Sequence, residues 1–354
     1  MKPTLENVAK LANTSIATVS RALNDSGYVS DDLKLKVEQA VKQLGYKRKV
    51  YKSLPLSTLS KIVVITNDDF SNPNSFYYAV LSGLKFEAER LEIDIEVVLI
   101  DSLGENKEAL KEQFEGADAV ILVGMENPNL LNVLKSLGKP VQIINGSDPS
   151  MQFSSISPDY EYGGYLAGQY LLEAGNRNNC IITVNLRQSL VDRQLGFQRA
   201  HRQTDIHPER SCKIIELVEY AKKHDPMLHD KIIHGTAGGD FGAKYLLPRI
   251  IDDGLLNNID GVFCICDLMA ISLMQALKNK KMANISIIGF DDLPISSLVT
   301  PQLTTIRSNY YDLAKQGLAM LISKQAHSTI SGIRAYMAVE LIERNSVYPQ
   351  IHPK

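Results

Sequence analysis

The chain of 354 residues is too long for one small domain and predicts two or three folded domains. Its composition, 44% hydrophobic and 22% charged, is that of an ordinary folded protein and excludes a disordered or low-complexity chain. The net charge of -2 is uneven: residues 1–54 hold ten Lys or Arg and five Asp or Glu, a net of +5, which leaves -7 on the rest. A basic segment on an acidic body fits a polyanionic partner that is held at one end.

Cellular location and cofactors follow from what the sequence lacks. No apolar run approaches the roughly 20 residues of a membrane helix, and no signal-peptide core precedes the first helix, so we expect a cytoplasmic protein without a membrane partner. Cysteines 180, 212, 264 and 266 do not predict a disulfide framework. Cys264 and Cys266 lie in the apolar run 262–266, where a buried strand fits better than a zinc site, because the spacing is short and no His lies nearby. We expect no metal and no cofactor.

Residues 4–24 predict two short helices joined by a tight turn. In the first helix the apolar residues recur at helical spacing, at Leu5, Val8, Ala9, Leu11 and Ala12. Asn13 tolerates a left-handed turn, and Ser15 can cap a second helix. That second helix buries Val19, Ala22 and Leu23.

The outer side of the second helix is typical of a helix-turn-helix, in which the start of this helix faces base edges in the major groove. Small surface helices of this kind are common, however, and the pattern alone leaves both interpretations open. The residues on or near the outer side are Ile16, Ala17, Thr18, Ser20, Arg21 and Asn24.

A third helix over residues 31–44 completes a small N-terminal domain. Ser30 and two acidic residues suit its start, and Gly45 ends it. Residues 47–60 follow as a basic linker. Three helices in so few residues make a minimal DNA-reading module.

From residue 61 onward, short apolar runs alternate with amphipathic helices. The predicted strands are 62–66, 95–100, 119–123, 141–144, 181–184, 213–217, 261–266 and 285–290. The predicted helices are 75–91, 105–115, 128–137, 159–174, 193–203, 240–253 and 268–279. Buried β-branched runs that alternate with helices predict an α/β fold of doubly wound parallel sheets, in two lobes with a cleft between them.

Polar side chains follow several of these strands directly. Asn145, Asp267 and Asp291 each come after the end of a predicted strand, and ligands of open α/β sheets bind at that edge. Carboxylate and amide groups suit sugar hydroxyls. Each aspartate can instead simply cap a helix, and the sequence leaves that alternative open.

No catalytic motif is present. The chain has no G-x-S-x-G elbow, no Walker loop and no H-E-x-x-H, and its seven His residues are scattered, so we do not expect an enzyme. A sugar-binding transport protein shares the two-lobed body, but the absent signal peptide and the basic N-terminal domain argue against it.

The chain resembles the lac-repressor (LacI/GalR) family of bacterial transcriptional regulators along nearly its whole length. The N-terminal motifs are T-L-x-x-V-A-x-x-A, S-x-x-T-V-S-R-x-L-N, Val29–Ser30 and Val37 with Leu44–Gly45–Tyr46. The body motifs begin at Ser71, Asp159, Arg193, Ile287, Pro301 and Glu340. Asn176 stands where the family usually has His, and Cys266 where many relatives carry Asn.

The resemblance implies three domains. They are a helix-turn-helix domain at 1–46, a hinge at 47–60 and an effector-binding and dimerisation domain at 61–354. Within the last, it implies a first lobe near 61–157 and 289–320 and a second near 158–288 and 321–345, with three crossings. A homodimer on double-stranded operator DNA is expected, and the absence of a leucine-repeat tail after Ser346 favours a dimer over a tetramer.

The resemblance also implies which residues contact DNA. Ile16, Ala17 and Arg21 would set base preference, and contacts to phosphates or groove edges would come from Thr4, Ser15, Thr18, Ser20, Asn24 and Tyr28. Leu54, or alternatively Leu56, would wedge into the minor groove from a hinge helix. Pro55 would end such a helix at that point.

The implied effector contacts are Phe76, Tyr77, Asn145, Arg193, Phe241, Asp267 and Asp291. Arg193, which we expect to open a helix, can also be a surface cation, and the aromatic residues can be ordinary core residues. The expected function is repression of sugar-utilisation genes, relieved by a small sugar between the lobes through an allosteric change. Co-repression by a purine or a sugar phosphate remains an alternative.

Overall fold

The computed structural model describes most of the chain in two compact units. The described residues are 3–15, 18–19, 22, 31–44, 46, 59–67, 71, 75–100, 112, 114–203, 212–282, 285–326 and 332–350. The two units are Met1–Leu56 and Ser57–Lys354. Among the helices in this part of the chain, none has the length and apolarity that crossing a membrane requires.

The N-terminal unit contains α1 (Leu5–Leu11) and α3 (Asp31–Leu44), which confirms the predicted first and third helices. Thr4 caps α1: its Oγ1 accepts a hydrogen bond from the Asn7 backbone N at 3.3 Å. The apolar sides of α1 and α3 meet in one small core, whose buried residues are Val8, Ala9, Ala12, Val19, Val37 and Ala40.

The first lobe is built on a six-stranded parallel sheet in the order β11-β5-β4-β3-β1-β2. Its strands are β1 (Lys61–Thr66), β2 (Asp94–Leu99), β3 (Ala119–Val123), β4 (Val141–Ile144), β5 (Ser154–Pro158) and β11 (Arg334–Met337). Successive residues of β1 point to opposite faces, so Ile62 and Val64 enter one core while Val63 and Ile65 enter another. Both faces are therefore buried, as expected for a parallel sheet.

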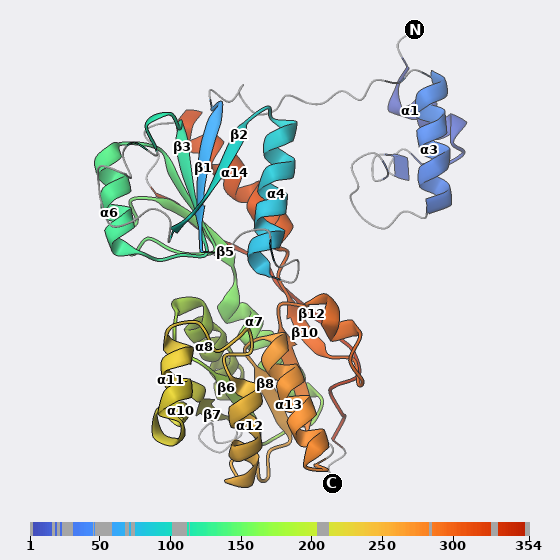
Figure 1. The fold of residues 1–354 in the computed structure, drawn as a ribbon. Helices are drawn as coiled ribbons and strands as arrows, with labels where there is room; N and C mark the ends of the chain where they lie inside the picture. Colours follow the sequence, from blue (N-terminus) through green and yellow to red (C-terminus); the bar gives the residue numbers. More distant parts are fainter. Residues whose placement is uncertain are drawn as a thin grey trace. The chain divides into compact units, whose positions relative to one another are not determined.

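Helices cover both faces of this sheet (Figure 1). On one face lie α4 (Phe76–Arg90) and α14 (Tyr310–Ala326), which pack against each other, and on the other lies α6 (Pro128–Leu137). The predicted helix over 105–115 lies mostly outside the described residues.

The second lobe has a six-stranded sheet in the order β12-β10-β9-β8-β6-β7. Its strands are β6 (Asn179–Thr183), β7 (Cys212–Glu216), β8 (Gly261–Cys264), β9 (Ser286–Phe290), β10 (Thr304–Arg307) and β12 (Glu340–Ile342). Only β12 pairs in the antiparallel direction among the described strands of this sheet. The helical elements are α7 (Tyr160–Glu173), α8 (Gln188–Arg202), α10 (Leu217–His224), α11 (Pro226–Ile233), α12 (Ala243–Asp252), α13 (Asp267–Asn279) and the 3-10 helix η2 (Pro294–Ser297).

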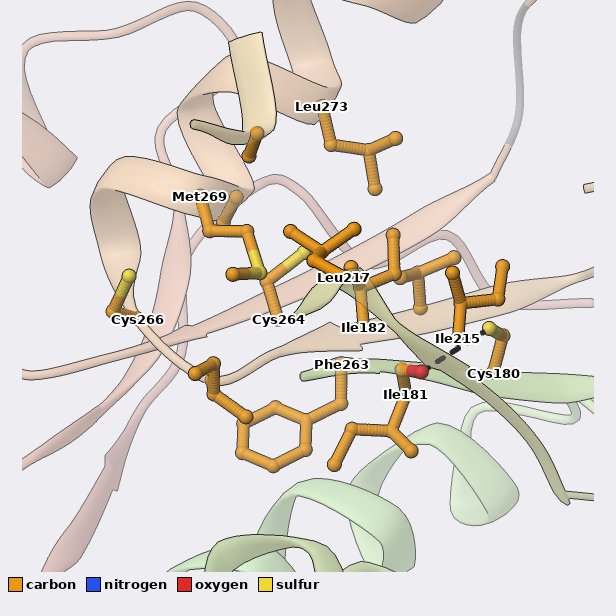
Figure 2. Packing of buried hydrophobic residues seen from close by; sticks show 14 of the residues in the cluster. Cys180, Ile181, Ile182, Ile215, Leu217, Phe263, Cys264, Cys266, Met269 and Leu273 are labelled. Atoms are coloured by element: carbon orange, nitrogen blue, oxygen red, sulfur yellow. Dashed lines mark hydrogen bonds between the residues drawn. The ribbon is translucent and has the colours of Figure 1, made fainter. Parts of the chain in front are cut away.

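Cys264 and Cys266 belong to the core of this lobe (Figure 2). Strand β8 ends at Cys264, two residues before the predicted end, because Cys266 is already the N-cap of α13. All four cysteines are free thiols. Burial raises the pKa of Cys266 to about 12, so this thiol stays protonated and is a poor metal ligand. No cluster of three or more potential metal ligands occurs in the part of the chain that the structure describes.

Helices α7 and α8 approach unusually closely, at two glycines. A Cβ built on Gly164 would lie 1.9 Å from the Arg193 carbonyl oxygen, and one on Gly196 would lie 1.7 Å from the Glu161 carbonyl oxygen. Only glycine, which has no Cβ, allows the backbones of α7 and α8 to come this close at these two positions.

The chain passes between the lobes after β5, after β10 and after β11. The predicted return to the first lobe near residue 289 is wrong, because β10 pairs with β9 in the second lobe. Ser346 supports that pairing: its Oγ accepts from Thr304 N and donates to Ile287 O. Assigning 321–345 to the second lobe is also wrong for the end of α14 and for β11, which pairs with β5 of the first lobe.

Candidate functional site

A cavity of about 440 Å³ lies between the two lobes at the carboxyl ends of their strands. The first lobe contributes Asn67, Ile100, Gly124, Met125, Glu126, Asn127, Asn145, Gly146, Ser147, Ser155, Ser157, Arg334 and Tyr336. The second lobe contributes Tyr160, Leu186, Arg187, Gln188, Ser189 and Asp192. Polar groups from both lobes therefore face one shared, partly open volume.

Asn145, a predicted effector contact, lines this cavity directly after β4. Its backbone is left-handed, with φ 59°, a conformation that Asn tolerates well. The Tyr160 hydroxyl donates a hydrogen bond to Asn145 Oδ1, and this bond joins the two lobes at the cavity wall.

Arg193 lies next to the cavity rather than in its lining. The prediction that it opens a helix is wrong, because α8 begins at Gln188 and Arg193 falls in its second turn. The residue is only 3% exposed, and its Nη2 lies 3.3 Å from Asp291 Oδ1. Its guanidinium carbon also lies 3.7 Å from the centroid of the Phe290 ring.

Asp291 lies partly buried directly after β9 and accepts from two side chains. Besides Arg193, the Tyr310 hydroxyl donates to Asp291 Oδ1 at 3.0 Å. Burial raises the pKa of Asp291, and the Arg193 guanidinium lowers it in part. The buried Arg193 and the partly buried Asp291 thus form an ion pair that borders the cavity.

Two tyrosines stand where the chain changes lobes. Tyr160 opens α7 after β5, and Tyr310 opens α14 after β10. Both are buried, and burial raises the pKa of each, so both hydroxyls remain available as donors. The crossing segments are therefore tied to Asn145 and Asp291, beside the cavity.

Phe76 and Tyr77, both predicted effector contacts, lie behind the cavity wall. A Cβ on Gly124 would lie 2.7 Å from the Phe76 ring and 2.8 Å from the Tyr77 ring. Asn67 Nδ2 donates to the Tyr77 hydroxyl at 3.5 Å. The two aromatic residues support Gly124 and Asn67, which line the cavity.

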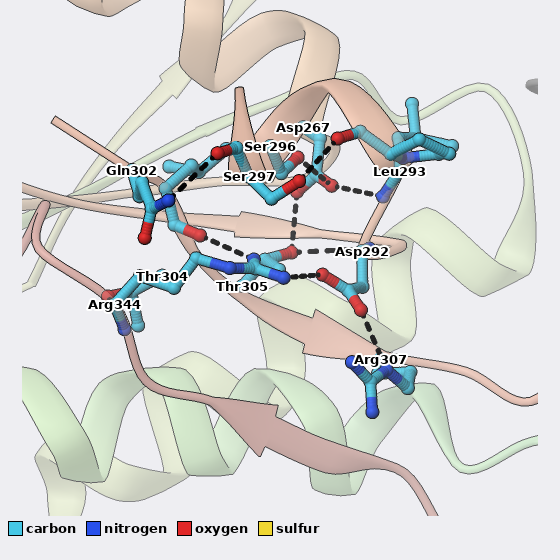
Figure 3. Close-up of polar contacts among 12 residues, drawn as sticks. Asp267, Asp292, Leu293, Ser296, Ser297, Gln302, Thr304, Thr305, Arg307 and Arg344 are labelled. Carbon is cyan, nitrogen blue, oxygen red and sulfur yellow. Dashed lines mark hydrogen bonds and ion pairs between the residues drawn. The ribbon is translucent and has the colours of Figure 1, made fainter. Parts of the chain in front are cut away.

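Asp267 and Phe241 are placed elsewhere in the second lobe. The Asp267 carboxylate accepts from Leu293 N at 2.8 Å, Ser296 Oγ at 2.6 Å and Thr305 Oγ1 at 2.5 Å (Figure 3). These bonds fix the segment that follows β9 against the start of α13. Phe241 packs against the hydrophobic core of this lobe.

Asp267→Asn is expected to gain stability relative to the unchanged protein as the pH rises from about 5 to about 7. Burial raises the pKa of Asp267 from 3.8 to about 7, so the folded protein retains a proton in this range that the unfolded chain has released. The stability that this carboxyl contributes is full below its unfolded pKa and is lost as the pH rises through 7, whereas asparagine does not titrate. Urea unfolding across this pH range measures the difference in the free energy of unfolding between the variant and the unchanged protein. Asp94→Asn, at an exposed site, is the control. If the difference for Asp267→Asn does not change with pH, the raised pKa of Asp267 is contradicted.

The cavity also contains charged residues that the sequence analysis missed. Arg187, Asp192 and Arg334 all line it. The rule that ligands bind at strand ends, applied to the strand predicted at 181–184, would have pointed to Arg187. Nothing in the sequence marked Arg334, since β11 is short and partly exposed.

For the DNA-binding side, the structure describes three of the predicted contact residues. Ser15 Oγ accepts from Thr18 N at 3.0 Å and lies 2.8 Å from Thr18 Oγ1, which agrees with the expected N-cap. Thr4 is exposed at the start of α1. The remaining predicted contacts lie outside the described residues: Ile16, Ala17, Ser20, Arg21, Asn24, Tyr28 and Leu54, with most of the linker at 47–60.

Two sequence families match the chain. Residues 4–49 match the family described as "Bacterial regulatory proteins, lacI family". Residues 215–347 match the "Periplasmic binding protein-like domain".

Individual relatives match along almost the whole chain. The ribose operon repressor of Haemophilus influenzae is 23% identical over 98% of this chain and 98% of its own length. The solved "transcriptional regulator CelR-cellobiose complex" is 22% identical, covers 97% of this chain and 99% of its own, and has a TM-score of 0.65. The lac repressor dimer bound to operator and the anti-inducer ONPF is 19% identical, covers 98% and 100%, and has a TM-score of 0.63. These structures share the fold described above.

Proposed function

The chain belongs to the lacI family of bacterial regulatory proteins, and we propose that it represses sugar-utilisation genes until a small sugar binds between its lobes. It is a DNA-binding regulator of transcription. A regulator of this kind acts where the chromosome is, so we place it in the cytoplasm. The ribose operon repressor and the cellobiose complex support a sugar as the effector.

The observation that carries this proposal is the polar cavity between the lobes. A sugar has hydroxyl groups around its ring and needs both donors and acceptors in fixed positions. The cavity supplies amides at Asn67, Asn127 and Asn145 and carboxylates at Glu126 and Asp192. This lining suits binding of a polyol, and the proposal assigns the cavity to binding rather than to catalysis.

The same geometry suggests how a ligand would act on DNA binding. A sugar that touches both lobes would bias the angle between them, because the Asn145–Tyr160 bond and the Asp291–Tyr310 bond lie beside the cavity at the crossing segments. In a homodimer, as in the lac repressor structure, such a change would alter the spacing of the two DNA-binding domains. Coupling of this kind is typically worth about 1–3 kcal/mol.

The test uses the purified full-length protein. DNA duplexes that the protein retains are first selected from a random double-stranded library. The duplex that binds most tightly then serves as the operator in a fluorescence-anisotropy titration, with and without each of a panel of sugars. If one sugar releases the protein from the operator, the proposal is supported. If a ligand tightens operator binding instead, the protein acts by co-repression. Failure to enrich any duplex contradicts the DNA-binding assignment.

Arg21→Ala is expected to weaken operator binding about 10- to 100-fold, because a base-reading arginine is worth about 1–3 kcal/mol. Thermal stabilisation by the effector should be unchanged, since Arg21 lies in the N-terminal unit and the cavity in the other. Arg177→Ala, at an exposed site on the second lobe, is the matched control. If the two variants bind the operator with equal affinity, the assignment of Arg21 as a base-reading residue is contradicted.

A further inference from the structure

We propose that the cavity binds a sugar that carries an anionic group, a carboxylate or a phosphate, held between Arg187 and Arg334. The inference rests on the proposed function and narrows its ligand. The two arginines come from different lobes and line the same cavity. An anion between them would hold the lobes together.

Arg334 enters the cavity from the edge of the first-lobe sheet. It and Tyr336 lie on one face of β11, beside Ser155 and Ser157 of β5, with which they are in register. All four line the cavity. Arg334 Nη2 donates to the Asp148 carbonyl oxygen at 3.1 Å, which orients the guanidinium. That bond uses one of five guanidinium donors.

Arg187 faces the cavity from the second lobe at the start of α8. It is the N-cap residue, with an extended backbone (φ -158°, ψ 157°), and its side chain makes no capping bond. Its exposed side chain leaves a cation at the cavity beside Gln188 and Ser189, the first residues of the helix. The positive end of the helix dipole adds to the attraction for an anion there.

The two carboxylates of the cavity already accept hydrogen bonds from neighbouring side chains. Glu126 Oε1 accepts from Ser147 Oγ at 2.9 Å, and Asp192 Oδ1 accepts from Gln188 Nε2 at 2.7 Å. Neither forms an ion pair of 4.0 Å or less with Arg187 or Arg334 in the described structure. Burial raises the pKa of Asp192, while the Gln188 hydrogen bond and the Arg334 charge lower it in part, so Arg334 acts on this carboxylate from beyond ion-pair distance. The carboxylates suit sugar hydroxyls, whereas the arginines suit an acidic group.

The size and the remaining lining fit a monosaccharide. A volume of about 440 Å³ lies in the range of small-ligand pockets. Tyr336 is 59% exposed and lines the cavity beside Arg334, where its ring can pack on the apolar face of a sugar. A sugar acid or a sugar phosphate would thus find an aromatic surface, hydroxyl partners and two cations in one site.

The test is isothermal titration calorimetry of the full-length protein with matched sets of sugars. Each of the gluco, galacto, manno and ribo series is offered as the neutral sugar, as the sugar acid and as the terminal phosphate. We expect at least one anionic member to bind about tenfold or more tightly than its neutral parent, since a charge-assisted bond exceeds a neutral one. Whether the acid or the phosphate prevails identifies the anionic group.

Arginine variants test the site itself. Arg187→Gln and Arg334→Gln should each weaken binding of the anionic sugar about 10- to 100-fold. Both should leave the affinity for the neutral parent within about threefold, because glutamine keeps hydrogen-bonding capacity but has no charge. Arg177→Gln, exposed outside the cavity, should change neither.

Three results would overturn the inference: neutral sugars that bind as tightly as anionic ones, no binding by any anionic sugar, or anionic binding that survives both variants. The operator titration separates this failure from failure of the proposed function. If a neutral sugar releases the protein from DNA, the proposed function stands and the anionic ligand is wrong. If no duplex is ever bound, the proposed function itself fails.

Discussion

Replacing Arg193 with methionine is expected to lower the free energy of unfolding by about 3 kcal/mol, because the largely buried Asp291 carboxylate loses its cation. Arg193 is 3% exposed and also donates to the Ile265 carbonyl oxygen, so the variant leaves that acceptor without its donor as well. Methionine keeps the aliphatic stem but removes the guanidinium that lies over the Phe290 ring, so a cation–π contact is lost with the charge. The loss therefore reports on charge rather than on volume. Urea unfolding followed by far-ultraviolet circular dichroism measures it.

A double variant sharpens this experiment. Arg193→Met with Asp291→Asn should recover about half or more of the loss, since no unpaired charge then remains buried. Arg199→Met is the matched control, because its ion pair with Glu161 is partly exposed and should be worth less than about 1 kcal/mol. If Arg193→Met costs no more than Arg199→Met, the buried pair does not stabilise the body. The affinity of the folded double variant for the effector, compared with that of the unchanged protein, shows whether Arg193 also contacts the ligand.

Gly196→Ala is expected to destabilise the protein by about 3 kcal/mol, the upper part of the range for overpacking. The added methyl group would lie 1.7 Å from the Glu161 carbonyl oxygen and 2.8 Å from the Tyr165 backbone N, so α7 and α8 must separate. In an open helix interior the same change would stabilise, because alanine is the better helix former. The sign of the effect therefore tests the close approach of the two helices.

Gly116→Ala provides the comparison. A Cβ there meets nothing within 4 Å, and its expected effect is within about 1 kcal/mol of zero or stabilising. Thermal or urea unfolding of the two variants and the unchanged protein decides the matter. Equal stability of all three would mean that α7 and α8 do not touch at Gly196.

The elements best predicted from sequence are fully buried strands and an amphipathic helix with a clear apolar repeat. Strands β3 and β4 and helix α6 have the predicted bounds, because apolar β-branched runs and a clear helical repeat lie between turn residues such as Gly124 and Gly138. Strands β5, β10, β11 and β12 escaped prediction. Strand β5 is buried but has the polar sequence SSISP, and the other three have only three or four residues, with exposed and partly buried positions in β11 and β12.

Residues of the cavity could be predicted from the sequence only where they directly follow a predicted strand, because ligands of parallel sheets bind at the carboxyl ends of strands. Asn145 was found in this way, and Arg187 follows from the same rule. The partner of Arg193 was not predictable, because Asp291 is far away in sequence and the pairing depends on how the second lobe folds. Arg334 reaches the cavity because the chain returns to the first lobe, which the predicted lobe boundaries did not place correctly.

The pairing of β11 with β5 has a consequence for the order in which the protein can fold during synthesis. The first-lobe sheet needs β11, Arg334–Met337, as its last strand, and one of its faces needs α14. Both are translated after β10, the last parallel strand of the second lobe. On a ribosome the second lobe can therefore close nearly all of its sheet while the first lobe still has an unpaired edge at β5 and an uncovered apolar face. The lobe that emerges first therefore stays incomplete while most of the second lobe can fold, and its exposed edge is where a nascent chain most needs protection from aggregation.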